Sequence, residues 1–215
     1  MSQPLPPLPD GPGLLFVISG PAGSGKTTLC DALLAAAPRA RRVVTCTSRP
    51  PRPGERDGVD YHFLAPAQFE TALAAGEFFE HARVHDRLYG SRKRDVLALL
   101  DLNHDILFNI DVQGAATIRA TCAADKNLAH RLVTLFLYPP PLDQLRQRLR
   151  TRAQDADAEI ERRLHNAALE TARWTEFDYC LPSGTRADDL ARLLALYISE
   201  RLKNRPGSTP PHDWP

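Results

Sequence analysis

Gly20-Pro-Ala-Gly-Ser-Gly-Lys-Thr27 decides the fold, because it consists of a glycine, four spacer residues and then Gly-Lys-Thr. The apolar run at 14–18 before it predicts a buried strand, and residues 28–37 after it predict a helix that ends before Pro38. Glycines between a strand and a helix let backbone amides turn toward an anion, which the positive end of the helix dipole also attracts. The stretch therefore predicts a phosphate-binding loop with a nucleoside triphosphate as its ligand.

Individual residues of this loop have expected roles. Lys26 is expected to reach the outer phosphates, and the Thr27 hydroxyl is expected to bind Mg²⁺. The alternative is a glycine-rich turn that fits the pattern by accident, but it does not explain the strand and helix on either side. The expected triphosphate-binding residues are Gly20, Pro21, Ala22, Gly23, Ser24, Gly25, Lys26, Thr27 and Thr28.

The composition predicts one globular domain. The 215 residues include 27 Lys and Arg and 26 Asp and Glu, and the formal net charge of +1 gives no reason to expect nucleic acid or a membrane as a partner. No apolar run approaches the ~20 residues of a membrane span. The four cysteines include no C-x-x-C pair, which favours reduced thiols and a cytoplasmic location. Residues 1–12 and 205–215, rich in proline, are expected to be a disordered leader and tail around a domain at 13–204.

A second strand, expected at 42–47, leads into a proline-rich loop at 48–61 that is unsuited to a helix or a central strand. This loop contains Arg49 and Arg52. Ligands bind at the carboxyl ends of parallel strands, and arginine binds phosphate through paired hydrogen bonds. The loop therefore predicts a second phosphate site, with a solvated surface linker as the alternative.

The remaining pattern predicts an open, doubly wound sheet. An arginine-rich helical region at 142–175 breaks near 153–157, and such a hairpin can close over a phosphate site and exclude water. A solvent-facing helical pair is the other interpretation. Further strands are expected at 61–64, 77–84, 105–111, 132–138 and 177–181, and further helices at 66–75, 93–100 and 187–202.

Four blocks of the chain resemble the guanylate kinases, a family of phosphate-loop nucleoside monophosphate kinases. The resemblance implies an α/β fold with a doubly wound, mostly parallel sheet, an inserted GMP-binding lobe at about 45–92 and a helical lid at about 142–172. It also implies phosphoryl transfer from ATP, with Mg²⁺, to GMP or dGMP, by a monomer or homo-oligomer. The blocks occur in family order at 20–29, 47–63, 80–91 and 109–115, within a similarity that runs from about 14 to 198.

The resemblance also implies roles for single residues. The GMP phosphate is expected at Arg49, Arg52, Tyr61 and Tyr89, and guanine at Thr45, Glu80, Ser91 and Asp111. Lys26, Arg152 and Arg163 are expected to act in the transfer, and Thr27, with Asn109 through a water, at the metal. The chemistry of guanine agrees, because its N1–H and 2-amino group are adjacent donors for one carboxylate. Adenine would leave that buried carboxylate unpaired, at a cost of about 1–3 kcal/mol.

Three segments depart from the family pattern. Asn109 replaces an aspartate, 151–153 replaces Gly-Arg-Gly, and 182–184 replaces an Asn-Asp stretch near the adenine. Two other functions are therefore considered, a non-catalytic interaction module and a kinase for a phosphorylated sugar. The intact Gly-Lys-Thr at 25–27 argues against the first, and the guanine-reading block argues against the second.

Overall fold

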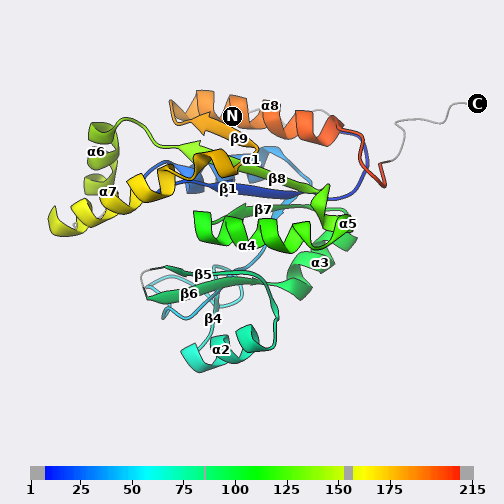
Figure 1. The fold of residues 1–215 in the computed structure, drawn as a ribbon, viewed down its shortest axis with the longest axis horizontal. Coiled ribbons are helices and arrows are strands. Elements are labelled where there is room, and N and C mark those ends of the chain that lie inside the picture. The colour runs from blue at the N-terminus through cyan, green and yellow to red at the C-terminus, as the bar shows by residue number, and fades with distance from the viewer. Residues whose placement is uncertain (1–7, 85, 153–156, 209–215) are drawn as a thin grey trace, which may run out of the picture.

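The core of the protein is a five-stranded parallel sheet in the order β2-β7-β1-β8-β9 (Figure 1). The computed structural model describes residues 8–84, 86–152 and 157–208. Strand β1, in the centre, leads directly into the phosphate-binding loop. The core strands are β1 (Leu15–Ser19), β2 (Ala40–Arg42), β7 (Asp105–Asn109), β8 (Leu132–Tyr138) and β9 (Tyr179–Pro182).

Helices cover both faces of this sheet. Phe16 and Ile18 of β1 pack toward α1 (Lys26–Ala36) and α8 (Arg186–Leu202), in one apolar cluster. Leu15 and Val17 pack toward α3 (Lys93–Asp101) and α4 (Val112–Ala123), in a second cluster. The short helix α5 (Lys126–Ala129) follows α4. Neighbouring side chains of a strand point to opposite faces, so a strand buried on both faces is apolar throughout. The expected doubly wound α/β fold is confirmed.

A smaller lobe, below the core in Figure 1, contains a four-stranded sheet in the order β4-β3-β6-β5. It has its own apolar cluster of Cys46, Phe69, Phe78 and Leu88. Phe79 joins the lobe to the core, because its ring stacks on Phe108 at 6.0 Å between centroids. The elements of the lobe are β3 (Cys46–Thr47), β4 (His62–Phe63), α2 (Pro66–Ala74), β5 (Phe78–Val84) and β6 (Arg87–Arg92).

The single strand expected at 42–47 is wrong. Strand β2 ends at Arg42 in the core sheet, and β3 begins at Cys46 in the lobe. Val43 belongs to the core cluster, whereas Cys46 belongs to the cluster of the lobe. One apolar run thus supplies two separate cores, which hydrophobicity alone does not reveal.

The strand expected at 105–111 is shorter than predicted, because β7 ends at Asn109. Asp111 instead caps α4, where its Oδ1 accepts a hydrogen bond from the Gly114 amide at 2.9 Å. Neither α4 nor α5 was expected from the sequence pattern.

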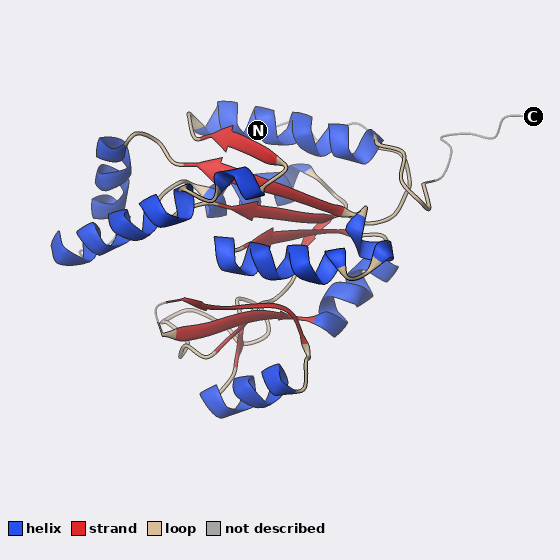
Figure 2. Cartoon of the chain, in the orientation of Figure 1, coloured by secondary structure: helices blue, strands red, loops and turns tan. Residues whose placement is uncertain are grey.

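Two helices, in the region predicted to be a lid and called the lid below, lie beside the carboxyl ends of the core strands, where the arrowheads in Figure 2 point. They are α6 (Leu142–Arg152) and α7 (Asp157–Thr171). Five buried side chains join them in a separate cluster. These are Leu145, Leu149, Ile160, Leu164 and Ala167. The expected break at 153–157 lies largely outside the described residues.

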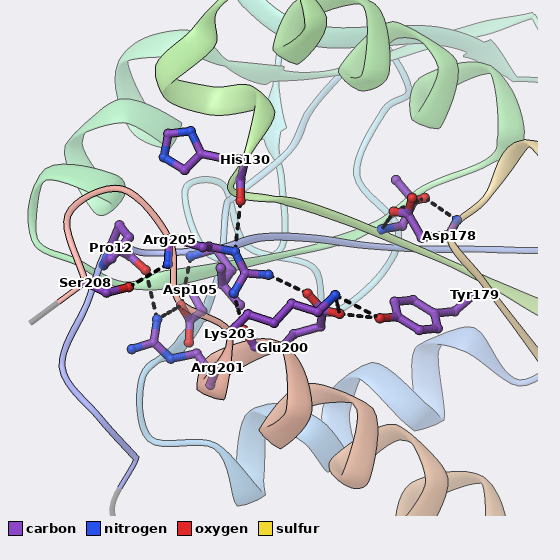
Figure 3. A network of polar contacts seen from close by, with 12 residues as sticks. Pro12, Asp105, His130, Asp178, Tyr179, Glu200, Arg201, Lys203, Arg205 and Ser208 are labelled. Atoms are coloured by element: carbon purple, nitrogen blue, oxygen red, sulfur yellow. Dashed lines mark hydrogen bonds and ion pairs between the residues drawn. The ribbon is translucent and has the colours of Figure 1, made fainter. Parts of the chain in front are cut away.

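The described ends of the chain meet at the amino ends of the core strands, where a network of polar contacts joins them (Figure 3). Arg201 donates hydrogen bonds to the carbonyls of Pro12 and Pro9, each at 2.8 Å, and contacts Asp105 Oδ1 at 3.3 Å. Arg205 Nε donates to the carbonyl of His130 at 2.9 Å. Residues 8–12 and 205–208, expected within the disordered leader and tail, are therefore bonded to the core.

The four cysteines are free thiols. Cys30, Cys46 and Cys122 are buried, and burial raises the pKa of the Cys30 and Cys122 thiols to about 12. Cys180 is exposed. Within the described parts of the chain, no helix has both the length and the apolarity that crossing a membrane requires.

Candidate active site

The phosphate-binding loop requires glycine at three points. Gly20, Gly23 and Gly25 have φ angles of 142°, 83° and 107°, which other residues rarely adopt. A Cβ at Gly20 would also collide with the carbonyl oxygen of Leu137, because the loop crosses the backbone of β8. The sequence therefore forms a tight loop at the end of β1 that opens toward the N-terminus of α1.

Lys26, the first residue of α1, reaches back over this loop. Its Nζ donates hydrogen bonds to the carbonyls of Gly20 and of Pro21, the latter at 3.1 Å. The neighbouring Thr27 Oγ1 accepts a hydrogen bond from Asn109 Nδ2 at 3.3 Å, so the ends of β7 and of the loop meet here. No cluster of three or more metal-ligating His, Cys, Asp or Glu side chains occurs among the described residues.

A cavity of about 410 Å³ lies between the loop and the lobe. Gly20, Ala22 and Lys26 form its wall on the loop side, and Asn109 lies beside them. Ser91 does not line the cavity, but its hydroxyl donates to Glu80 Oε1 at 2.8 Å. The other residues expected to bind GMP all line it, namely Thr45, Arg49, Arg52, Tyr61, Glu80, Tyr89 and Asp111.

One end of this cavity is basic. Glu55 holds Arg49 through two hydrogen bonds of 2.8 Å and also accepts the Arg52 amide at 2.6 Å. The hydrogen bonds from Arg49 and then Arg52 lower the pKa of Glu55 to about 2, so Glu55 stays ionised. The guanidinium of Arg49 lies 5.2 Å from the Tyr61 ring centroid. Glu55 was not predicted, although its position three residues after Arg52 across a Pro-Gly turn is a usable signal.

The other end is acidic and buried. Glu80 is 2% exposed. Burial raises the pKa of Glu80 to about 7, and the nearby Asp111 adds to this effect. Asp111 also lines this end of the cavity, and its Oδ1 accepts a hydrogen bond from the Gly114 amide of α4. The cavity therefore suits a molecule with an anion at one end and hydrogen-bond donors at the other.

Helix α7 places two charged residues at this site. Arg163 lines an adjoining cavity of about 330 Å³, and its Nε donates to Glu159 Oε1 at 2.9 Å. Glu170 lines both cavities, and burial raises its pKa to about 7, against the opposing effect of Lys26. Glu170 was not predicted, although its spacing of seven residues from Arg163 places both on one helix face. The side chain of Arg152 lies outside the described residues.

A third cavity, of about 480 Å³, opens on the far side of the loop. Gly23, Ser24, Gly25 and Thr28 line it, together with Arg148 and Thr151 of α6 and Asp189 of α8. The segment at 182–184 contributes Ser183 and Gly184. The Ser183 hydroxyl donates to the Ser24 carbonyl at 3.0 Å and accepts from Arg148 at 3.2 Å.

A glycine-rich phosphate loop between two cavities, with two helices beside it, is the arrangement of a phosphate-loop kinase. The family model for guanylate kinase matches residues 13–200, and the chain therefore belongs to the guanylate kinase family.

Relatives agree with this assignment. The chain is 40% identical to a guanylate kinase of Paramagnetospirillum magneticum, over 89% of this chain and 86% of that protein. It is 42% identical to a guanylate kinase of Thiobacillus denitrificans, over 91% and 90%. A crystal structure of guanylate kinase from Anaplasma phagocytophilum is 26% identical, with a TM-score of 0.71 over 91% of this chain and 89% of that one. The predicted ATP-dependent guanylate kinase is confirmed, and no finding favours an interaction module or a sugar-phosphate kinase.

Proposed function

We propose that the 410 Å³ cavity is the acceptor site, which binds the phosphate of GMP or dGMP at its basic end and guanine at its acidic end. The opposite charges of the two ends are the observation that supports this orientation. Glu80 would accept the two adjacent donors of guanine, and Ser91 keeps its other oxygen in place. Arg49, Arg52, Tyr61 and Tyr89 would bind the phosphate, and Thr45 and Asp111 would complete the base site.

The third cavity is proposed to bind the nucleoside of ATP, since it shares the loop with the acceptor site. The triphosphate would then follow the loop from Gly23 toward Lys26. The Ser183 hydroxyl already has two partners, so the segment at 182–184 provides little discrimination among donor bases.

Mg²⁺ fits the junction of Thr27 and Asn109 as an ion that arrives with the nucleotide. Mg²⁺ prefers oxygen ligands and keeps several waters, and it is usually bound by few protein groups together with substrate phosphates. The Thr27 hydroxyl offers one such oxygen, and the Asn109 carbonyl can orient a metal-bound water. When bound, the ion would neutralise charge on the triphosphate.

The residues of the chain would contribute chiefly alignment and charge, because phosphoryl transfer needs no strong general base. Lys26 would exchange its carbonyl partners for the donor phosphates. Arg163, with Arg152, would stabilise the charge on the transferred group, and Arg163 can do so through its amino groups while its Nε stays bonded to Glu159. Closure of α6 and α7 would exclude water and so prevent hydrolysis.

A coupled assay of ADP release over a panel of acceptors tests the function. With ATP and Mg²⁺, GMP and dGMP are expected to be phosphorylated, whereas AMP, CMP, UMP and a phosphorylated sugar should react little. Comparable rates with AMP would contradict the proposed orientation, because Glu80 and Asp111 would then not select the base.

A further inference from the structure

Gly114, in the first turn of α4, lies directly against the carboxylate of Glu80. A Cβ at this position would be 3.1 Å from Glu80 Oε2 and 3.3 Å from Ile110 Cδ1. Gly114 is not among the glycines with positive φ, so its backbone conformation does not require glycine. Glycine is less favourable than alanine inside a helix. What glycine provides here is therefore space rather than conformational freedom.

The two oxygens of the Glu80 carboxylate have different neighbours. Its Oε1 accepts the Ser91 hydroxyl at 2.8 Å, while Oε2 faces Gly114. Strand β5 is itself fixed to α4, since the Thr121 hydroxyl donates to the Phe79 carbonyl at 3.2 Å. A methyl group at position 114 would thus be accommodated only by displacing the carboxylate or the helix.

The same contact places Glu80 near the N-terminus of α4. The Gly114 amide is bonded to Asp111 Oδ1 within that first turn. The positive end of the helix dipole favours an ionised carboxylate nearby. An added methyl would separate Glu80 from this turn, which favours the protonated form.

We propose that Gly114 is a specificity-determining positioning residue. Because it has no side chain, the Glu80 carboxylate can lie against α4, in the position where it accepts the two donors of guanine. The inference rests on the proposed role of Glu80 in reading the base. Gly114 acts through Glu80 and need not contact the nucleotide itself.

Gly114→Ala tests this inference. The KM for GMP is expected to rise about tenfold, which corresponds to about 1.4 kcal/mol, while the KM for ATP and the Tm stay close to the parent values. The acid limb of kcat/KM for GMP should also move to higher pH. Gly11→Ala is the matched control, because its Cβ would have only ordinary contacts, at 3.8 Å or more.

A double-mutant cycle with Glu80→Ala shows whether Gly114→Ala changes the KM for GMP through Glu80. In the Glu80→Ala background, Gly114→Ala should no longer change the KM for GMP. An equal rise in both backgrounds, or no rise in the parent, would overturn the inference alone. If Glu80→Ala itself leaves the KM for GMP unchanged, the proposed base site is wrong, and the inference fails with it.

Combination with Glu80→Asp covers the case in which Gly114→Ala does not fold. Aspartate is one methylene shorter and withdraws the carboxylate from position 114. Recovery of folding in the double variant would support the contact, and failure to recover would overturn it.

Discussion

Glu80→Gln should stabilise the protein at neutral and alkaline pH while it weakens GMP binding. The folded protein holds the pKa of Glu80 at about 7, above the 4.5 of an ordinary glutamate, chiefly because the group is buried. The unfolded chain therefore releases this proton more easily, and stability falls as the pH rises from about 4.5 to about 7. Glutamine has nearly the same shape but no proton to lose.

The size of the effect follows from the same two pKa values. At about 1.4 kcal/mol per pKa unit, an ionised Glu80 costs about 3 kcal/mol at pH 8 and less than about 1 kcal/mol at pH 5. Urea unfolding of both proteins at the two pH values measures the difference. Glu77→Gln is a suitable control, because Glu77 is exposed and directly precedes β5, the strand that contains Glu80. This change should alter stability by less than about 0.5 kcal/mol.

The result would refute the reasoning if Glu80→Gln gave the same change in unfolding free energy at pH 5 and pH 8. The stabilised variant should also show a raised KM for GMP, because the glutamine amide would place a donor against the donors of guanine. Base recognition at this site is thus expected to reduce stability.

Three further changes test other parts of the site and fold. Arg52→Lys should weaken GMP binding about tenfold in calorimetry with the fold intact, because lysine keeps the charge but not the paired hydrogen bonds; an unchanged affinity would favour a solvated linker. Asn109→Asp should lower the half-saturating Mg²⁺ concentration by about tenfold without changing the accepted base, and coinciding rate curves would show that position 109 does not act through the metal. Arg201→Met should cost about 3–5 kcal/mol in urea unfolding with little change in either KM, because it leaves Asp105, whose side chain is 1% exposed, without its cation; a loss below about 1 kcal/mol would contradict this account.

The central strands and the phosphate loop were predictable, because each leaves a local pattern. Strands β1, β7 and β8 are buried on both faces and appear as continuous apolar runs, and the loop has a fixed spacing of glycines. The division between β2 and β3 was not predictable, because Val43 and Cys46 are both apolar yet pack in different cores. The hydrophobicity of a residue predicts its burial but not the core in which it is buried.

The residues predicted to bind GMP come, by resemblance, from three of the four blocks and from Thr45 just before one of them, and seven of the eight line one cavity. Their supporting residues were harder to find. Glu55 orients Arg49 through a local turn, but Gly114 meets Glu80 only because α4 packs against β5. Such a contact depends on the tertiary arrangement, and no spacing along the sequence records it.

The bonds between Arg201 and the residues near the start of the chain have a topological consequence. Gly11 and Ser208 approach so closely that a Cβ at Gly11 would lie 3.8 Å from the Ser208 Cα. This junction lies across the sheet from the lid, at the amino ends of the core strands (Figure 1). Nearby termini are the condition under which a chain tolerates circular permutation. Residues 11 and 208 therefore lie close enough for a short peptide to join them into a ring, in which the chain could begin at an exposed turn elsewhere.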